Sequence, residues 1–182
     1  MSQILVIGVG NPNRGDDALG LEAALRLAAR ALPGVRVTHC SGDAALLLSA
    51  WEGAQRVILV DAAQTGAAPG TIRRLEAQRG PLPAALLHAS THSLGVVEAV
   101  ELARALGRLP ASLTVYAVEG AHFGHGGRLS LAVEAVLGEV VEQVAAEVEG
   151  RVCEQAPLRR VSCRSSSRVA DTPRGGPRPR TC

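Results

Sequence analysis

The 182 residues carry a formal net charge of +2, and hydrophobic residues make up 47% of them against 2% for aromatic residues. This length suffices for one domain whose core is built from aliphatic side chains. No run reaches the roughly 18 consecutive apolar residues of a membrane span, and no charged start before an apolar stretch suggests a secretion signal. The four cysteines lack CxxC spacing, which argues against a zinc site or a disulfide framework. We expect a monomeric cytoplasmic protein that does not contact a membrane.

The charge is divided unevenly along the chain. Residues 151–182 hold eight arginines against two acidic residues, a balance of +6, so residues 1–150 carry −4. The C-terminal segment is rich in Arg, Ser, Pro and Gly, and it cannot bury enough apolar surface to offset the entropy of ordering it. We predict one α/β domain over residues 1–150 and a disordered basic tail over 151–182. Because the tail has no aromatic residue, a solvated extension is favoured over a nucleic-acid-binding arm.

Within residues 1–150, apolar runs alternate with helical patterns. Runs rich in Val, Ile, Leu or Thr predict five strands, at 3–9, 35–40, 56–61, 70–75 and 112–118. Apolar residues at helical spacing predict helices at 93–107 and 133–148. This alternation predicts a three-layer sandwich, in which a mostly parallel sheet of about five strands has helices on both faces. The connection from 56–61 to 70–75 is too short for a helical crossover, so we expect these two strands to be antiparallel neighbours.

The first strand leads into a glycine-rich turn that carries two carboxylates. Gly10 and Gly15 have the separation of a P-loop, but Asp16 and Asp17 follow where that loop needs Lys and Ser or Thr. Asn13 stands where a dinucleotide fingerprint needs its third glycine. Two negative charges would repel a phosphate at this helix N-terminus. The turn therefore favours a cation over a nucleotide.

Acidic residues follow three of the predicted strands. Asp16 and Asp17 come after the first strand, Asp61 closes the third and Glu119 closes the last. The carboxyl ends of the strands form the functional crevice of an open α/β sheet. His92 directly precedes a predicted helix and can join the same edge. Carboxylates together with an imidazole are suitable ligands for a divalent metal such as nickel or zinc.

Each of these residues also has a structural interpretation. One acid of the pair in the first turn could cap the first helix, and Asp61 could accept hydrogen bonds from loop amides. Ser90 or Thr91 could cap the next helix and leave His92 facing solvent. The stretch 122–127 contains two further histidines and predicts a mobile loop. The convergence of several such residues on one edge is what favours a functional site.

Six segments occur in a characteristic order along residues 1–150. They are ILVIGVGN at 4–11, RGDDALG at 14–20, VILVDA at 57–62, PGT at 69–71, STHSLG at 90–95 and GRLS at 127–130. Each motif alone is weak, but the ordered set is specific, and together they resemble the hydrogenase maturation endopeptidases. Members of that family remove a short C-terminal extension from the large-subunit precursor of a nickel–iron hydrogenase after nickel has been inserted.

The resemblance implies a metal-contacting set of Asp17, Asp61 and His92, with Asp17 and Asp61 as the catalytic acids. Nickel would arrive bound to the precursor, and no nucleotide is implied. The metal could polarise the scissile carbonyl or activate a water, or an aspartate could act as general base. Both routes stay open, so the resemblance implies an aspartic-type or metal-assisted endopeptidase.

The roles of three nearby residues are less determined. Asp16 is either a helix cap or a partner of the neighbouring ligand. Ala18 stands where many family members have glycine. Asp43 adds a charge next to the expected substrate groove, in a segment where family members commonly have Gly-Gly-Thr or Gly-Gly-Ser.

Other functional classes remain open. One is a nucleotide-binding oxidoreductase, although the charge of the first turn argues against it. A cysteine hydrolase could use Cys40 with His92 as its base, although a Cys that ends a buried strand is more often a small hydrophobic residue. A serine hydrolase is disfavoured because the Gly-x-Ser-x-Gly elbow is missing. The non-enzymatic alternative is a maturation chaperone that grips the nickel-loaded precursor through the same three ligands without cutting it.

Overall fold

A computed structural model describes residues 4–83, 86 and 95–150. Its sheet has five strands in the order β2-β1-β3-β5-β4. The strands are β1 (Ile4–Val9), β2 (Val35–Cys40), β3 (Arg56–Ala63), β4 (Ile72–Glu76) and β5 (Ser112–Glu119). Strands β2, β1, β3 and β5 are parallel, and β4 is antiparallel to β5. The predicted mostly parallel sheet with one antiparallel strand is confirmed.

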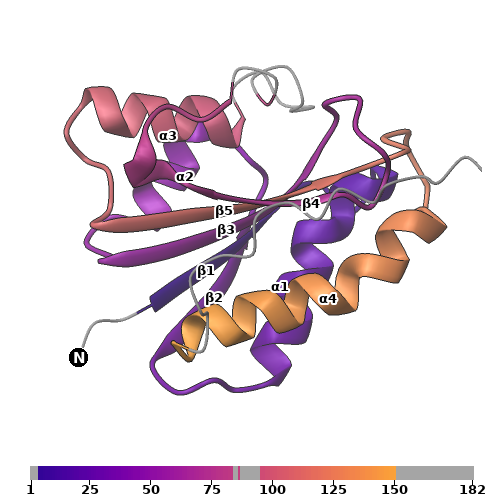
Figure 1. Ribbon diagram of the computed structural model, residues 1–182, viewed down its shortest axis with the longest axis horizontal. Coiled ribbons are helices and arrows are strands. Elements are labelled where there is room, and N and C mark those ends of the chain that lie inside the picture. Colours follow the sequence, from indigo (N-terminus) through magenta and orange to yellow (C-terminus); the bar gives the residue numbers. More distant parts are fainter. Residues whose placement is uncertain (1–3, 84–85, 87–94, 151–182) are drawn as a thin grey trace, which may run out of the picture. The chain divides into compact units, whose positions relative to one another are not determined.

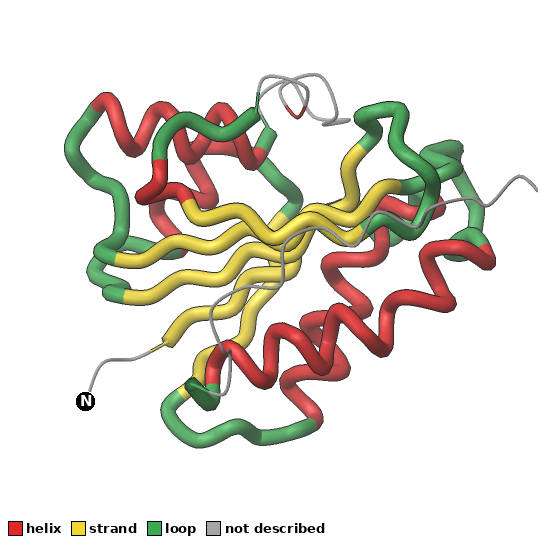
Figure 2. The backbone as a smooth tube through the Cα atoms, in the orientation of Figure 1, coloured by secondary structure: helices red, strands yellow, loops and turns green. Residues whose placement is uncertain are grey.

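Helices cover both faces of the sheet. They are α1 (Leu19–Ala29), α2 (Ala44–Ala50), α3 (Val96–Ala105) and α4 (Leu131–Val148), with 3-10 turns η1 (Gly15–Ala18) and η2 (Ala77–Arg79). Helices α2 and α3 lie on one face, and α1 and α4 lie on the other (Figure 1). The tube view in Figure 2 shows the same three layers, which confirms the predicted sandwich. No helix among the described residues is long and apolar enough to cross a membrane.

Side chains of the central strands alternate between two cores. Leu59 and Ala63 of β3 belong to the core beneath α2 and α3, whereas Ile58 and Val60 belong to the core beneath α1 and α4. Successive side chains of a strand point to opposite faces. Asp61 shares the parity of Leu59 and Ala63, so its side chain lies on the α2–α3 face, at the carboxyl end of the strand.

Two glycines let α1 pack directly on β1. A Cβ at Gly8 would lie 2.0 Å from the carbonyl oxygen of Gly20, and a Cβ at Gly20 would lie 2.1 Å from the carbonyl oxygen of Val9. Both distances are far below any real van der Waals contact. Glycine at these two positions therefore brings the start of α1, and with it the η1 turn, against the carboxyl end of β1.

Three predicted features differ from the structure. The strand predicted at 70–75 is β4, which is antiparallel as expected but pairs with β5 and not with β3. Strand β3 continues to Ala63, so Asp61 lies within the strand and does not close it. Helix α3 begins at Val96, later than predicted. The disordered tail predicted for 151–182 lies outside the described residues.

Candidate active site

Asp16 is fully buried in the η1 turn, and donors from one distant loop surround its carboxylate. Three backbone N–H groups donate to it, from Ala121 at 2.7 Å, His122 at 2.9 Å and Ser130 at 2.6 Å, and the Ser130 hydroxyl donates at 2.9 Å. Burial alone would raise the pKa of Asp16, but the hydrogen bonds from Ser130, Ala121 and His122 outweigh it and hold the pKa below its usual value. Asp16 is therefore an ionised structural acceptor.

Glu119 plays a similar part for the loop that follows β3. Its buried carboxylate accepts hydrogen bonds from the backbone N–H groups of Thr65 at 2.7 Å, Gly66 at 2.7 Å and Ala67 at 3.2 Å. The Thr65 hydroxyl adds a fourth bond at 2.6 Å. The prediction that Glu119 closes its strand is confirmed, and its side chain is used to hold this loop.

Asp17 and Asp61 form the remaining acidic pair of this edge. Asp17 is only 3% exposed, and its carboxylate accepts a hydrogen bond of 3.1 Å from the backbone N–H of Asn11, just past β1. Burial raises the pKa of Asp61 well above its usual range, and the negative charge of Asp17 raises it further, against the opposing effect of the Ala62 N–H. The two carboxylates are thus close enough to repel each other.

The helix-cap interpretation of the acid pair is wrong. Neither η1 nor α1 has a side-chain hydrogen bond at its N-cap, because Asp16 bonds to the 121–130 loop and Asp17 to the end of β1. At α3 the N-cap is Gly95, whose N–H donates to the Glu98 carboxylate at 2.9 Å. Neither Ser90 nor Thr91 therefore occupies that cap.

Three predicted residues remain for comparison with the structure. His92 lies outside the described residues. Asp43 is exposed and caps α2 by accepting a 3.0 Å hydrogen bond from the N–H of Leu46. Cys40 is partly buried and packs against the core beneath α2 and α3, as a small hydrophobic residue would.

The capacity of this edge for a metal rests on two carboxylates. Among the residues that the structure describes, no group of three or more His, Cys, Asp or Glu side chains could hold an ion. Asp17, in the η1 turn after β1, and Asp61, near the end of β3, supply carboxylate oxygens, which hard or borderline divalent ions accept as ligands.

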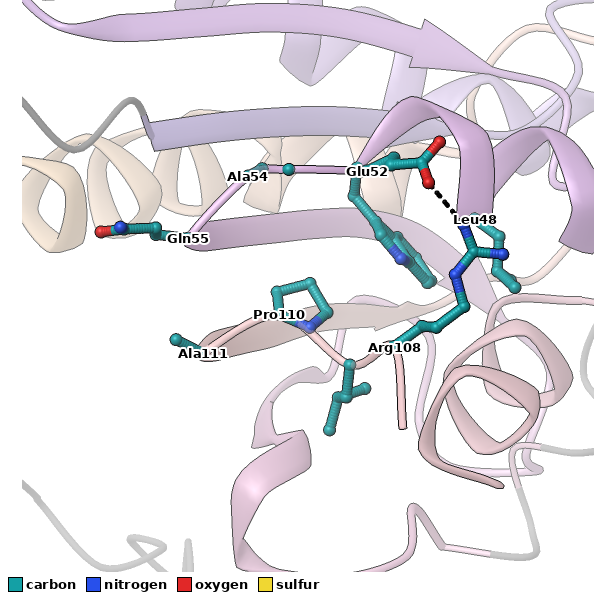
Figure 3. A pocket seen from close by; sticks show the side chains of 10 residues that line it. Leu48, Glu52, Ala54, Gln55, Arg108, Pro110 and Ala111 are labelled. Atoms are coloured by element: carbon teal, nitrogen blue, oxygen red, sulfur yellow. Dashed lines mark hydrogen bonds and ion pairs between the residues drawn. The ribbon is translucent and has the colours of Figure 1, made fainter. Parts of the chain in front are cut away.

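A pocket of about 360 Å³ lies elsewhere on the domain. Trp51, Arg108 and Pro110 help to line it, and the Arg108 guanidinium pairs with Glu52 at its rim (Figure 3). Gln55 and Ala111, which directly precede β3 and β5, place this pocket at the amino ends of the strands. It therefore lies at the opposite end of the strands from Asp17 and Asp61.

Sequence reasoning missed one residue of this edge. Ser130 supplies two of the four hydrogen bonds to Asp16, although 114 positions separate the two residues. Its only signal in the sequence was its place in the GRLS segment at 127–130. A pairing over that distance leaves no periodic pattern to read.

The site defines a class of protein: a five-stranded α/β domain with an acidic pair at the carboxyl ends of its parallel strands. Residues 26–147 match the family model of the hydrogenase maturation proteases, HycI. The chain belongs to this family, which makes it a peptidase of hydrogenase maturation. The match includes Asp61 but begins after Asp17.

Individual relatives support the same assignment. The chain is 26% identical over 149 residues to the hydrogenase expression/formation protein HupD of Rhodobacter capsulatus, which covers 80% of this chain and 71% of that protein. It is similar to the solved structure of an endopeptidase from Escherichia coli, with 30% identity, a TM-score of 0.70 and coverage of 81% and 94% of the two chains. It is also similar to the solved structure of the hydrogenase maturating endopeptidase HybD of Escherichia coli, with 26% identity and a TM-score of 0.66. That match covers 81% of this chain and 93% of HybD.

Proposed function

We propose that this protein removes a C-terminal extension from the large-subunit precursor of a nickel–iron hydrogenase after nickel insertion. The observation that carries the proposal is the pair of Asp17, which is buried, and Asp61, whose pKa is raised by burial and by the negative charge of Asp17. A divalent cation placed between two such carboxylates relieves their repulsion. Nickel bound in the precursor supplies that charge, so docking depends on whether the metal has been inserted.

The precursor's nickel is held by Asp17, Asp61 and His92 in this proposal. Its other coordination positions are filled by the precursor itself. Recognition of the metal and alignment of the scissile bond then become one event. A precursor without nickel leaves the two acids repelling each other and binds weakly.

Hydrolysis requires a water whose oxygen adds to the scissile carbonyl carbon while its proton moves to a base. The carboxylate of Asp61, beside the metal at the carboxyl end of β3, accepts this proton as the general base. The same proton then passes to the leaving amine as the C–N bond breaks. The nickel of the substrate stabilises the negative charge that develops on the carbonyl oxygen.

The test is the intact mass of the precursor after incubation with the full chain, with and without nickel loading. We expect loss of a C-terminal peptide only from the loaded form. Asp17→Asn should abolish this loss while the thermal unfolding remains cooperative, and Glu139→Gln, an exposed change on α4, serves as the control. Binding without loss of mass would favour the non-cleaving chaperone, and trimming of unloaded precursor would refute the nickel requirement.

A further inference from the structure

The buried carboxylate of Asp16 is held by four hydrogen bonds from the 121–130 loop. Oδ2 accepts three of them, from the N–H groups of Ala121 and His122 and the Ser130 hydroxyl, and Oδ1 accepts one from the Ser130 N–H. The contacts of its carboxylate are thus with the 121–130 loop, yet Asp16 is the direct neighbour of Asp17 in the chain.

Further bonds tie the same two segments together. The backbone N–H of Asp16 donates to the carbonyl oxygen of His122 at 2.8 Å, and the N–H of Gly126 donates to the carbonyl oxygen of Asn13 at 2.9 Å. Gly15, at φ +53°, allows this approach, because a Cβ there would lie 2.5 Å from the His122 carbonyl oxygen. The turn before α1 and the loop before α4 are therefore one hydrogen-bonded unit.

We propose that Asp16 is a positioning residue for the peptidase reaction. It sets the orientation of Asp17 by fixing the single turn of η1 that carries both residues, and it holds the 121–130 loop as a wall beside the acid pair. This inference rests on the function proposed above. The loop at 122–127, which the sequence predicts to be mobile, is then anchored by Asp16. This anchoring is needed for catalysis as well as for folding.

The chain contains a matched control for this inference. Glu147, at the other end of α4, is also a buried carboxylate with four bonds, two from Arg74 and one each from Thr114 and Tyr116. The helix rises about 1.5 Å per residue, so about 25 Å of α4 separate Glu147 from Ser130. Losing either carboxylate disturbs a comparable network, but only Asp16 adjoins the acid pair.

The experiment compares single-turnover trimming of nickel-loaded precursor by Asp16→Asn and Glu147→Gln at a temperature where both full-length variants are folded. We expect the rate constant of Asp16→Asn to fall about 100-fold, the loss typical of a misplacement of about 1 Å, with little change in precursor affinity. Glu147→Gln should lower the melting temperature and leave the rate unchanged. Amide exchange should also accelerate at Ala121 and His122 in the Asp16 variant alone.

A milder pair keeps the test decisive if Asp16→Asn does not fold. Ser130→Ala and Thr114→Val each remove one hydroxyl bond of 2.9 Å, to Asp16 and Glu147 respectively. Only Ser130→Ala should slow trimming. Equal rates within each pair, with trimming by the wild type intact, would overturn the positioning role. A wild-type chain that never trims loaded precursor would instead overturn the proposed function, and this inference with it.

Discussion

Replacing Asp61 and replacing Asp16 with asparagine should change stability in opposite directions, although both carboxylates lie at one edge of the sheet. Asp61 is ionised in the fold only at a cost, because burial and the charge of Asp17 oppose it. Asp16 is ionised with the help of four hydrogen bonds. Asp61→Asn should therefore stabilise the protein at pH 7, and Asp16→Asn should destabilise it.

The magnitudes follow from these contacts. Removing the Asp61 charge removes the unfavourable burial of that charge and its repulsion from Asp17, so the free energy of unfolding should rise at pH 7. In Asp16→Asn the new amide NH₂ meets a surrounding set of donors, and each buried group left unpaired costs about 1–3 kcal/mol. We expect a loss of about 3 kcal/mol for this variant. Each 1 kcal/mol shifts the melting temperature by about 2–4 °C in a chain of this size.

The changes in the free energy of unfolding caused by Asp61→Asn and by Asp16→Asn should also depend on pH in opposite ways. The folded-state pKa of Asp61 is raised, so its contribution to stability is fully present below the unfolded pKa of about 3.9 and is lost as the pH rises through the folded pKa. The advantage of Asp61→Asn therefore grows with pH. The folded-state pKa of Asp16 is lowered, so its contribution is present above about pH 3.9 and is lost as the pH falls through the folded value.

Differential scanning calorimetry of the full-length wild type and both variants, from pH 3 to pH 8, measures these shifts. Subtracting the wild-type melting temperature from that of the variant at each pH removes the contribution of all other titrating groups, provided that their pKa values are the same in both proteins. A stabilised Asp16→Asn, a destabilised Asp61→Asn at pH 7, or differences that do not vary with pH would refute the electrostatic account of this edge.

Three further predictions test other parts of the structure. Glu119→Gln should lose about 1–3 kcal/mol and accelerate amide exchange at 65–67, and unchanged exchange there would contradict its role as the acceptor for that loop. Gly20→Ala should prevent folding or lower the melting temperature sharply, because its Cβ would lie 2.1 Å from a backbone oxygen. Gly138→Ala is the control, because this glycine lies on the exposed face of α4 with open space around it. It should raise the free energy of unfolding, measured by calorimetry, by about 1 kcal/mol. Cys40→Ala should trim nickel-loaded precursor at the wild-type rate, since the side chain packs as a hydrophobic residue, and a lost rate would favour the cysteine hydrolase.

The fold was largely readable from the sequence because its signals are local. Apolar runs bounded by Gly and Pro located the strands within a few residues, and helical spacing located α3 and α4. The partner of β4 was not readable in this way. A short connection after β3 indicated the antiparallel direction, but β5, which comes later in the chain, inserts between β3 and β4 and pairs with both.

The candidate site was readable to a smaller degree. That four carboxylates gather at the carboxyl ends of the strands was predicted from the parallel direction of those strands. Which of the four accept hydrogen bonds depends on loops far away in the sequence. Asp16 and Glu119 take their donors from 121–130 and 65–67, and no periodicity reports such contacts. The assignment of His92 stays a prediction, because that residue lies outside the described range.

The geometry of one short turn explains why two adjacent aspartates have different environments. A 3-10 helix has three residues per turn, so successive side chains point about 120° apart. Asp16 therefore points to the donors of the 121–130 loop while Asp17 points to the end of β1, toward Asn11. Exchanging their roles would require rotating the whole turn, which the bond between Asp16 N–H and His122 and the tight fit at Gly15 oppose. This asymmetry supports the assignment of Asp17, the second acid of the pair, as the one that meets the metal in the proposed function.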